Sequence, residues 1–375
     1  MIRKDLSWIE VSQKALSQNI RILKSTLGSK TKLSVSVKAN AYGHGIVETS
    51  RIFLRNGADG LCVNSFEELL KLKNESIKCP ILIIGYVPPR QIKQAIKLKA
   101  DLFGFNYDYL KIISSEAKKI KKHASIYLKI DTGMSRQGIL ADQISDLIKK
   151  IKKLPYLNIT GLSTHFATAD GKINNKEFLK QLNSFQKSAE IVQASYNSVI
   201  LCCANSAASL TYPQARLDMA RIGISAYGYY PSIETKKIWK GKPLIPALSF
   251  KTIVTQIKDI PVDSLVGYGG TFKAKKQMRV AILPVGYYDG LDRKLSNKGE
   301  ILVDGKKAKI IGRICMNLTI VDITAIDGVK IGDEAVIIGR QGKEQITADD
   351  LAKQIGTINY EVLARLRENL NKYYL

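Results

Sequence analysis

Short apolar runs alternate with longer stretches of helical period over roughly the first 230 residues, and this alternation constrains the fold most. Eight of the runs have the length and the Val, Ile and Leu content of buried strands. Eight strand–helix units are typical of a closed (β/α)8 barrel, whereas an open doubly wound sheet usually has fewer units and a Gly-rich first turn. The sequence contains neither a GxGxxG nor a P-loop motif, which favours the barrel. The expected strands are residues 33–37, 60–63, 81–84, 102–105, 126–130, 160–163, 199–202 and 219–223.

The expected helices lie between these strands, at residues 65–74, 90–98, 107–121, 141–153 and 175–195. Two of them end with the run KKIKK, which predicts Lys side chains on the solvent side of amphipathic helices. The chain has 58 Lys and Arg against 33 Asp and Glu, a net charge of +25. Such a charge attracts anions, from phosphorylated cofactors to nucleic acid, without selecting among them. Because no aromatic side chains interleave with the Lys runs to stack on bases, we expect no nucleic-acid partner.

The pattern changes near residue 240. The Pro- and Gly-rich segment KGKPLIP (240–246) resembles a linker, and the short β-branched runs that follow are separated by Asp-Gly turns. We therefore expect two domains, a barrel at residues 1–240 and a small all-β domain at residues 241–375 that ends with a helix at 349–354. The first ten or so residues are candidates to pair with the β-domain.

Patterns for targeting and for metal binding are missing from the sequence. The five Cys residues are an odd number without a CxxC pair, so we expect neither a disulfide framework nor a zinc ribbon. Three His residues argue against a His-rich metal centre. The N-terminus lacks the apolar segment of a signal peptide, and no apolar run is long enough for a membrane span. We expect a cytoplasmic protein with no membrane partner and no metal.

Side chains that can carry chemistry follow the expected strands, and the active site of a barrel lies where its strands end. A Lys at the end of a buried strand is costly unless a partner or covalent chemistry accounts for it. Two interpretations of Lys38 are equally well supported by the sequence. It is either an amine that attacks an aldehyde or a side chain that extends to solvent at the barrel mouth. The other residues at strand ends are Lys129, Arg136, His165, Asn205, Ser206, Arg221, Gly223 and Ile224.

The loops after the last two strands form the usual phosphate site of such barrels, and here they carry small or polar residues. An aldehyde-reactive lysine beside a phosphate site suggests either pyridoxal 5′-phosphate (PLP) or a sugar-phosphate aldolase. A PLP site needs a group that faces the pyridine nitrogen, and Arg221 is the candidate.

Ten segments, in chain order, also resemble bacterial alanine racemases, and together they cover essentially the whole chain. They are VKANAYGHG at Lys38, LKIDTGMSRQG, THFATAD, ANSAA, RIGISAYG, PALSF, GYGGTF, PVGYYDG, GRICMN and INYEV. The resemblance implies a PLP-dependent homodimer with shared active sites, in which a (β/α)8 barrel is followed by a β-domain. It also implies that the enzyme interconverts L- and D-alanine and so supplies D-alanine for peptidoglycan.

The same resemblance implies the roles of single residues. Lys38 would carry PLP and act as one catalytic base, and Tyr268 of the partner subunit would be the opposite base. His165 would connect Arg221 to that tyrosine. The cofactor would be surrounded by Tyr42, His165, Asn205, Ser206, Arg221, Gly223, Ile224 and Tyr360. Arg136 and the backbone of Met316 would orient the substrate carboxylate, a carbamylated Lys129 would hold Arg136, and Tyr287 would line the entrance.

The sequence departs from the family pattern in two places. Asn317 stands where most relatives have Asp, which removes a carboxylate from the substrate mouth, and the C-terminal segment LARLRENLNKYYL differs from the usual ending. The alternative functions are a broad-specificity racemase and a basic amino-acid decarboxylase of the same fold. The missing signal peptide argues against the racemase, which is usually exported. Arg221 opposite the ring nitrogen argues against the decarboxylase.

Overall fold

The computed structural model describes residues 5–172 and 175–375 and divides into two compact units. The barrel unit consists of Ala15–Ala41 and Ile46–Ile245. The β unit consists of Met1–Lys14, Tyr42–Gly45 and Pro246–Leu375. Residues 1–4, which belong to the segment expected to pair with the β-domain, lie outside the described residues.

Eight parallel strands form the barrel, and they pair in the order β10-β2-β3-β4-β5-β6-β8-β9. Each expected strand is present, so the predicted (β/α)8 architecture is confirmed. The ring closes between β9 and β10 through the hydrogen bond that the Arg221 amide donates to the carbonyl of Ala204, at 2.9 Å. The strands are β2 (Lys32–Ser36), β3 (Gly60–Val63), β4 (Ile81–Ile83), β5 (Asp101–Gly104), β6 (Ala124–Asp131), β8 (Leu157–Ser163), β9 (Ile200–Cys202) and β10 (Met219–Ile222); the short β7 (Ile139–Leu140) pairs with β6.

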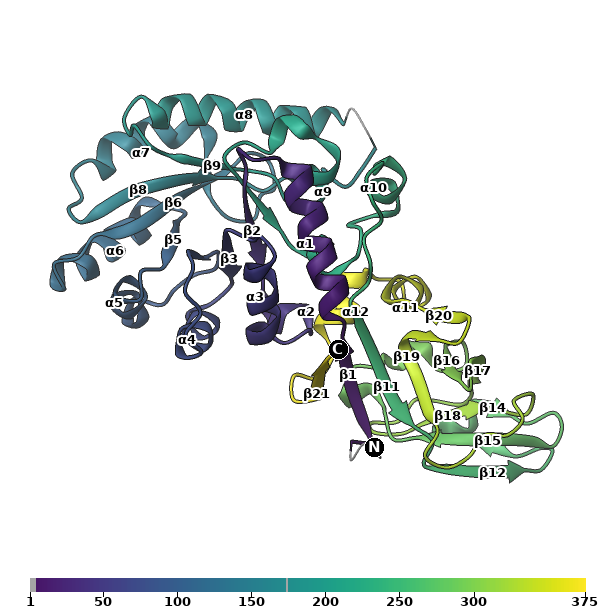
Figure 1. Cartoon of the computed structure of the whole chain (residues 1–375). Helices are drawn as coiled ribbons and strands as arrows, with labels where there is room; N and C mark the ends of the chain where they lie inside the picture. The colour runs from purple at the N-terminus through teal and green to yellow at the C-terminus, as the bar shows by residue number, and fades with distance from the viewer. Residues whose placement is uncertain (1–4, 173–174) are drawn as a thin grey trace. The chain divides into compact units, whose positions relative to one another are not determined.

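Helices surround these strands (Figure 1). Polar side chains begin several of them; Ser65, for example, accepts a hydrogen bond from the amide of Glu68, and Asn106 accepts one from the amide of Tyr109. The helices are α1 (Gln13–Leu27), α3 (Ile46–Arg55), α4 (Phe66–Asn74), α5 (Pro89–Lys97), α6 (Tyr107–Lys119), α7 (Ile144–Ile151), α8 (Lys176–Gln193), α9 (Ser206–Thr211) and α10 (Ile233–Ile238).

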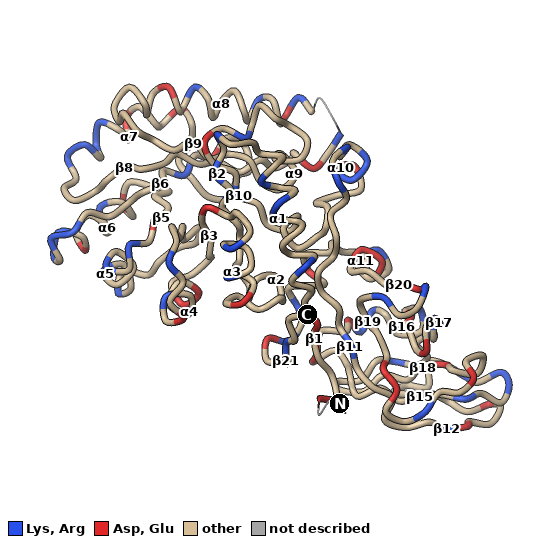
Figure 2. The backbone as a smooth tube through the Cα atoms, viewed as in Figure 1, with Lys and Arg blue, Asp and Glu red and all other residues tan. Residues whose placement is uncertain are grey.

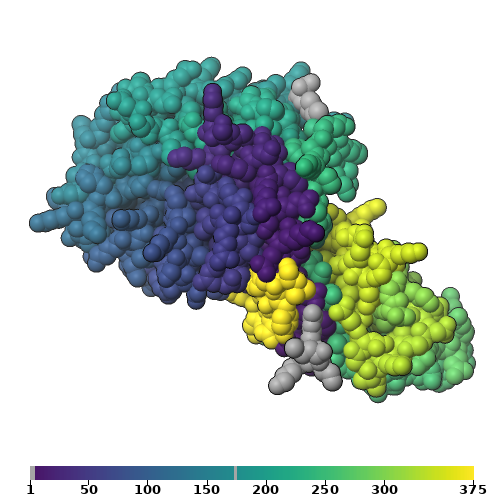
Figure 3. Space-filling model, in the orientation of Figure 1, coloured from purple at the N-terminus to yellow at the C-terminus, as the bar shows by residue number. Residues whose placement is uncertain are grey.

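Lysines gather where α6 and α7 end (Figure 2). In the second KKIKK run, Lys149, Lys150, Lys152 and Lys153 are exposed while Ile151 is buried. This is the arrangement that an amphipathic helix produces when its apolar face lies on the barrel. Helix α8 covers a further part of the barrel unit's outer surface (Figure 3). None of the helices in the described part of the chain is long and apolar enough to cross a membrane.

Side chains fill the interior of the barrel, so it is a core and not a pore. One cluster consists of Cys62, Leu82, Phe103, Tyr127, Cys202 and Met219. The Tyr127 ring explains why residue 161 is glycine, because a Cβ there would lie 2.1 Å from the ring. Met219 of this cluster lies on β10, the strand of Arg221, and Cys202 lies on the adjacent strand β9.

The β unit is built on one large sheet with the strand order β12-β15-β18-β17-β16-β19-β11-β1-β21. The N-terminal strand β1 lies inside this sheet, antiparallel to β11 and parallel to the C-terminal strand β21. Its strands are β1 (Ser7–Val11), β11 (Leu248–Ile253), β12 (Gln256–Ile260), β15 (Met278–Leu283), β16 (Glu300–Val303), β17 (Lys306–Ile310), β18 (Thr319–Asp322), β19 (Glu334–Gln341), β20 (Glu344–Ile346) and β21 (Asn371–Tyr374); β13 (Leu265–Val266) pairs with β14 (Phe272–Lys273).

Two local features of the β unit differ from the simplest reading of its sequence. The apolar run 249–257 forms two strands, because the amides of Val254 and Thr255 bond to Asp333 and Ile282 and turn the chain between β11 and β12. Two helices close the unit, α11 (Ala348–Ile355) and α12 (Asn359–Ala364). The yellow C-terminal residues lie at the surface of the β unit in Figure 3.

Candidate active site

Lys38 follows β2 at the mouth of the barrel and is half-buried. Its amine makes no hydrogen bond or ion pair with any residue that the structure describes. Burial lowers the pKa of Lys38, and the positive charges of Arg136 and Arg221 lower it further. A lysine with a lowered pKa carries a larger share of free amine near neutral pH, and the free amine is the form that attacks an aldehyde or accepts a proton.

The chain leaves Lys38 in a left-handed turn. Ala39, Asn40, Ala41 and Tyr42 have φ values of 53°, 52°, 54° and 51°, although none of them is glycine. L-residues in this conformation cost about 1–2 kcal/mol each. The Asn40 side chain supports the turn by accepting a hydrogen bond from the amide of Ile46 at 2.9 Å. Strain concentrated beside a half-buried lysine is typical of a functional segment.

Arg221 is buried in the wall of the barrel, and hydrogen bonds fix its guanidinium. Nη1 donates to Ser163 Oγ at 2.5 Å and to the carbonyl of Cys202 at 3.0 Å, and it lies 2.9 Å from Cys202 Sγ. Nη2 donates to the carbonyl of Thr164 at 2.8 Å. Nε makes no hydrogen bond within the described residues. The guanidinium is therefore held at both terminal nitrogens and has one N–H left for a ligand.

His165 is half-buried beside this guanidinium, with Nδ1 3.4 Å from Arg221 Nη2. Burial lowers the pKa of His165 well below its usual value, and the charge of Arg221 acts in the same direction. The imidazole is thus neutral near pH 7. Because an arginine can only donate, Nδ1 accepts and Nε2 carries the proton.

Lys129 is buried on β6 without a hydrogen bond or an ion pair in the described part of the barrel unit. Burial lowers its pKa well below the usual value, and so do the charges of Arg221 and Arg136. Arg136 itself lies in the exposed loop after β6. The Asp131 carboxylate shapes that loop by accepting bonds from the amides of three residues, Gly133, Met134 and Ser135.

The expected phosphate-binding residues in the barrel unit lie close together. The Gly223 amide donates to Ser206 Oγ at 2.9 Å, which joins the loops after β9 and β10. The Asn205 side chain accepts from the amide of Ala208 at 3.0 Å and donates to the carbonyl of Phe166 at 3.5 Å. Asn205 therefore positions the start of α9, where Ser206 lies, and Ile224 directly follows Gly223.

The β unit brings together two pairs of expected site residues. The rings of Tyr42 and Tyr360 lie 6.1 Å apart. The amides of Tyr287 and Tyr288 bond to the carbonyls of Cys315 and Met316, which holds the Tyr287 loop next to the Met316 loop. Tyr268 is 70% exposed and Met316 54% exposed, and Asn317 is exposed as well.

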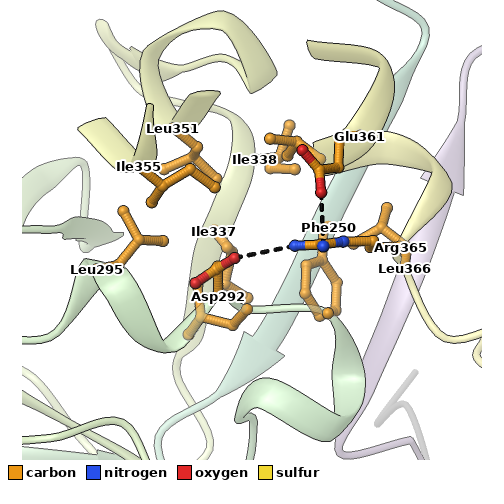
Figure 4. Close-up of a pocket in the computed structure, with 13 residues that line it drawn as sticks. Phe250, Asp292, Leu295, Ile337, Ile338, Leu351, Ile355, Glu361, Arg365 and Leu366 are labelled. Carbon is orange, nitrogen blue, oxygen red and sulfur yellow. Dashed lines mark hydrogen bonds and ion pairs between the residues drawn. The ribbon is translucent and has the colours of Figure 1, made fainter. Parts of the chain in front are cut away.

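One cavity in the β unit has no role in this chemistry (Figure 4). Its lining is largely apolar, with Phe250, Leu351 and Ile355 among the residues around it. Its three charged lining residues pair with one another, since Arg365 forms ion pairs with Asp292 and Glu361. None of the expected site residues lines this cavity.

Both lysines of the barrel mouth lie in a field set mainly by cations. Arg136 and Arg221 lower the pKa of Lys38 and of Lys129, while Glu68 raises the pKa of Lys38 and Asp131 raises that of Lys129. Three residues of this mouth were not singled out from the sequence: Ser163, Cys202 and Glu68. Ser163 could have been found from the sequence, because it lies two residues before His165 on the same strand end. The fold and the site thus define a (β/α)8-barrel protein with an unbonded lysine amine, of lowered pKa, among cationic side chains at the barrel mouth.

Comparison with known proteins agrees with this class over the whole chain. Residues 11–231 match the family described as "Alanine racemase, N-terminal domain", and residues 247–374 match "Alanine racemase, C-terminal domain". The chain is 41% identical to an alanine racemase of Leptospira interrogans, over 97% of this chain and 94% of that protein. It is 38% identical to the alanine racemase of Methanococcus maripaludis, over 98% of both chains. The protein belongs to the alanine racemase family.

Solved structures show the same relationship. The alanine racemase of Bacillus anthracis with bound L-Ala-P superposes with a TM-score of 0.94 at 31% identity, over 100% of this chain and 96% of that one. The histidine racemase of Leuconostoc mesenteroides superposes with a TM-score of 0.89 at 25% identity, over 99% and 98% of the two chains. The family's fold therefore accommodates more than one amino-acid substrate.

Proposed function

We propose that this protein is an isomerase that interconverts L- and D-alanine, using PLP held by Lys38 and one base on each side of the α-carbon. The D-alanine would supply peptidoglycan synthesis, and the protein would act in the cytoplasm. The observation that carries the proposal is the environment of Arg221, whose terminal nitrogens are fully engaged while Nε–H remains available beside a free lysine amine.

The residues present fit PLP in three respects. A pyridine nitrogen is an acceptor, which matches the remaining Nε–H donor of Arg221. The phosphate is an anion, which suits a mouth rich in Lys and Arg and the loops joined by Ser206 and Gly223. The aldehyde needs a free amine, and the pKa of Lys38 is lowered. The residues that would hold the cofactor are Lys38, Tyr42, Asn205, Ser206, Arg221, Gly223, Ile224 and Tyr360, with His165 beside Arg221.

PLP, when bound, would withdraw electrons from the α-carbon of the amino acid. Inversion at that carbon requires removal of a proton from one face and return of a proton to the other. Lys38 would move the proton on one face. Tyr268 of the partner subunit would move it on the opposite face, and the proton on Nε2 of the neutral His165 would stabilise the ionised phenol by a hydrogen bond.

Arg221 would limit the reaction to racemisation. A guanidinium does not release its proton near neutral pH, so a ring nitrogen that accepts from Nε stays unprotonated and withdraws electrons weakly. Charge on the α-carbon would therefore be short-lived, which disfavours decarboxylation and transamination. A carboxylate in the place of Arg221 would favour those reactions.

We further propose that Arg136 and the backbone of Met316 orient the substrate carboxylate, with Tyr287 and Asn317 at the entrance. Lys129 would react with CO2 through its neutral amine, forming an N–C bond and releasing a proton. The resulting carbamate anion would pair with the Arg136 guanidinium. A lowered pKa favours this reaction because only the unprotonated amine attacks CO2.

The test is to incubate the purified protein with PLP and L-alanine in D2O. The expected result is loss of optical rotation together with deuterium at the α-carbon. Serine, lysine and histidine are assayed in parallel, since a histidine racemase shares the fold. If serine, lysine or histidine is turned over faster than alanine, that amino acid is the preferred substrate and the proposal is wrong on this point. Release of CO2 would identify a decarboxylase.

A further inference from the structure

The Glu68 side chain joins the ends of two neighbouring barrel strands. Its Oε1 accepts a hydrogen bond from the amide of Ala39 at 2.7 Å, and its Oε2 accepts one from the amide of Asn64 at 2.6 Å. Ala39 follows β2 and Asn64 follows β3, which pair in parallel. One carboxylate thus bonds to backbone amides of two different βα loops.

Capping of its own helix does not account for this arrangement. Glu68 lies in the first turn of α4, where a glutamate is common and would ordinarily bond to the amide of the N-cap residue, here Ser65. The carboxylate bonds instead to the residue before the cap and to a separate loop. The bond to Ala39 adds nothing to α4, so its effect falls on the loop that contains Lys38.

The position of Ala39 makes that bond consequential. Ala39 directly follows Lys38 and is the first of four residues in the left-handed turn. Such a turn is unfavourable for non-glycine residues, so it persists only where the surroundings hold it. A charge-assisted bond to its first amide is well placed to hold both the turn and the direction in which Lys38 leaves β2.

Glu68 also sets the charge around the lysine. The groups that act on Lys38 are the cations Arg136 and Arg221, the Cys62 thiol and the Glu68 carboxylate. His165 is neutral near pH 7, for the reasons given above. Glu68 is thus the carboxylate that offsets the two guanidinium groups, and it raises the pKa of Lys38 against their effect.

We propose that Glu68 is a positioning residue for Lys38. Glu68 holds the left-handed turn through the Ala39 amide and places a negative charge near the lysine. This inference rests on the proposed function of Lys38 as the lysine that carries PLP. It assigns to Glu68 no direct contact with the substrate.

The test compares Glu68→Gln with Glu67→Gln. Glu67 is the adjacent residue on the same helix, and its carboxylate bonds to Gln91 instead of to the Lys38 loop. Both variants lose one negative charge. A glutamine at 68 offers one acceptor and one donor, so it can satisfy only one of the two amides that Glu68 satisfies.

The first readout is hydrogen exchange of backbone amides in the holoenzyme. In Glu68→Gln, exchange at Ala39 or Asn64 is expected to accelerate about tenfold or more, while Glu67→Gln matches the wild type. The second readout is the pH midpoint at which cofactor-stripped protein captures added PLP at Lys38, followed by its visible absorbance. Loss of the Glu68 charge moves this midpoint to lower pH, because the ammonium form of Lys38 loses a stabilising anion.

The outcomes separate the two hypotheses. Exchange rates and pH midpoints that are the same in Glu68→Gln as in Glu67→Gln overturn the role of Glu68. A Lys38→Ala variant that captures PLP as well as the wild type overturns the proposed function instead. Thermal unfolding of both variants, compared with the wild type, shows whether either effect comes from general loss of the fold.

Discussion

The barrel unit and the β unit present their expected catalytic residues in opposite ways. In the barrel unit, Arg221 and Lys129 are buried, and hydrogen bonds from the same unit fix the Arg221 guanidinium. In the β unit, Tyr268 and Met316 are more than half exposed. The barrel residues thus obtain their pKa shifts and orientation from their own surroundings. Tyr268 and Met316 are largely uncovered within their unit, and we propose that a second copy of the chain covers them.

The difference predicts which substitutions remove cofactor capture and which remove only catalysis. Lys38 would be needed for both, and Tyr268 for catalysis alone. The predictions below test this division, in order from the largest effect to the smallest.

Lys38→Ala is expected to abolish both the visible absorbance of bound PLP and racemisation, with a loss of activity greater than about 10⁴-fold. The substitution removes the amine that would hold the cofactor and move the proton. Absorbance spectra and polarimetry measure the two effects. A visible band that survives in Lys38→Ala would show that another lysine holds PLP.

Tyr268→Phe is expected to keep the absorbance band and to lose racemisation by about 10²- to 10⁴-fold, the range for loss of one acid–base group. The phenol is exposed within its unit, so its hydroxyl contributes little to folding. Tyr288→Phe, a second exposed tyrosine of the β unit, serves as the control and should remain active. Wild-type turnover in Tyr268→Phe would remove this residue from the mechanism.

Lys129→Ala is expected to raise KM for alanine roughly 5- to 30-fold with a smaller change in kcat, because Arg136 loses the carbamate that would orient it. Growth with 13C-bicarbonate should give a carbamate carbon resonance in the wild type that is missing from the variant. The exposed Lys150→Ala is the control and should keep both the resonance and the KM. Absence of the resonance from wild-type protein would refute carbamylation.

His165→Gln is expected to alter the pH dependence of stability. The folded protein resists protonation of His165, whereas the unfolded chain binds this proton near pH 6.5. The unfolded state therefore binds more protons below that pH, and the wild type loses stability as the pH falls through this window. The variant lacks this loss. When the pH is lowered from 7 to 5.5, the unfolding free energy of the variant minus that of the wild type should therefore increase by about 1 kcal/mol. Urea denaturation at both pH values measures it, and a constant difference would show that His165 titrates normally.

The sequence predicted the barrel because its strands are buried on both sides and therefore stand out as continuous apolar runs. It also placed Lys38, His165 and Arg221 at the strand ends, since chain order fixes which residues reach the mouth. The strand break at Val254 and the second closing helix, α12, were not predicted, because tertiary hydrogen bonds decide them.

The support around the site was the least predictable part. The left-handed turn at Ala39–Tyr42 has no glycine to signal it. Ser163 and Cys202 contact Arg221 from two other strands, and Glu68 reaches Ala39 from a neighbouring loop. Such contacts depend on the register between strands, which no local pattern in one sequence reveals.

Complementation between two inactive variants tests most directly whether active sites are shared between subunits. Lys38→Ala and Tyr268→Phe chains are unfolded together, refolded at equal concentration and assayed for alanine racemisation, with refolded wild type as the reference. A mixed dimer would contain one site with both residues intact, so about a quarter of the wild-type activity should return. A mixture as inactive as its two components would contradict a site built from Lys38 of one chain and Tyr268 of the other.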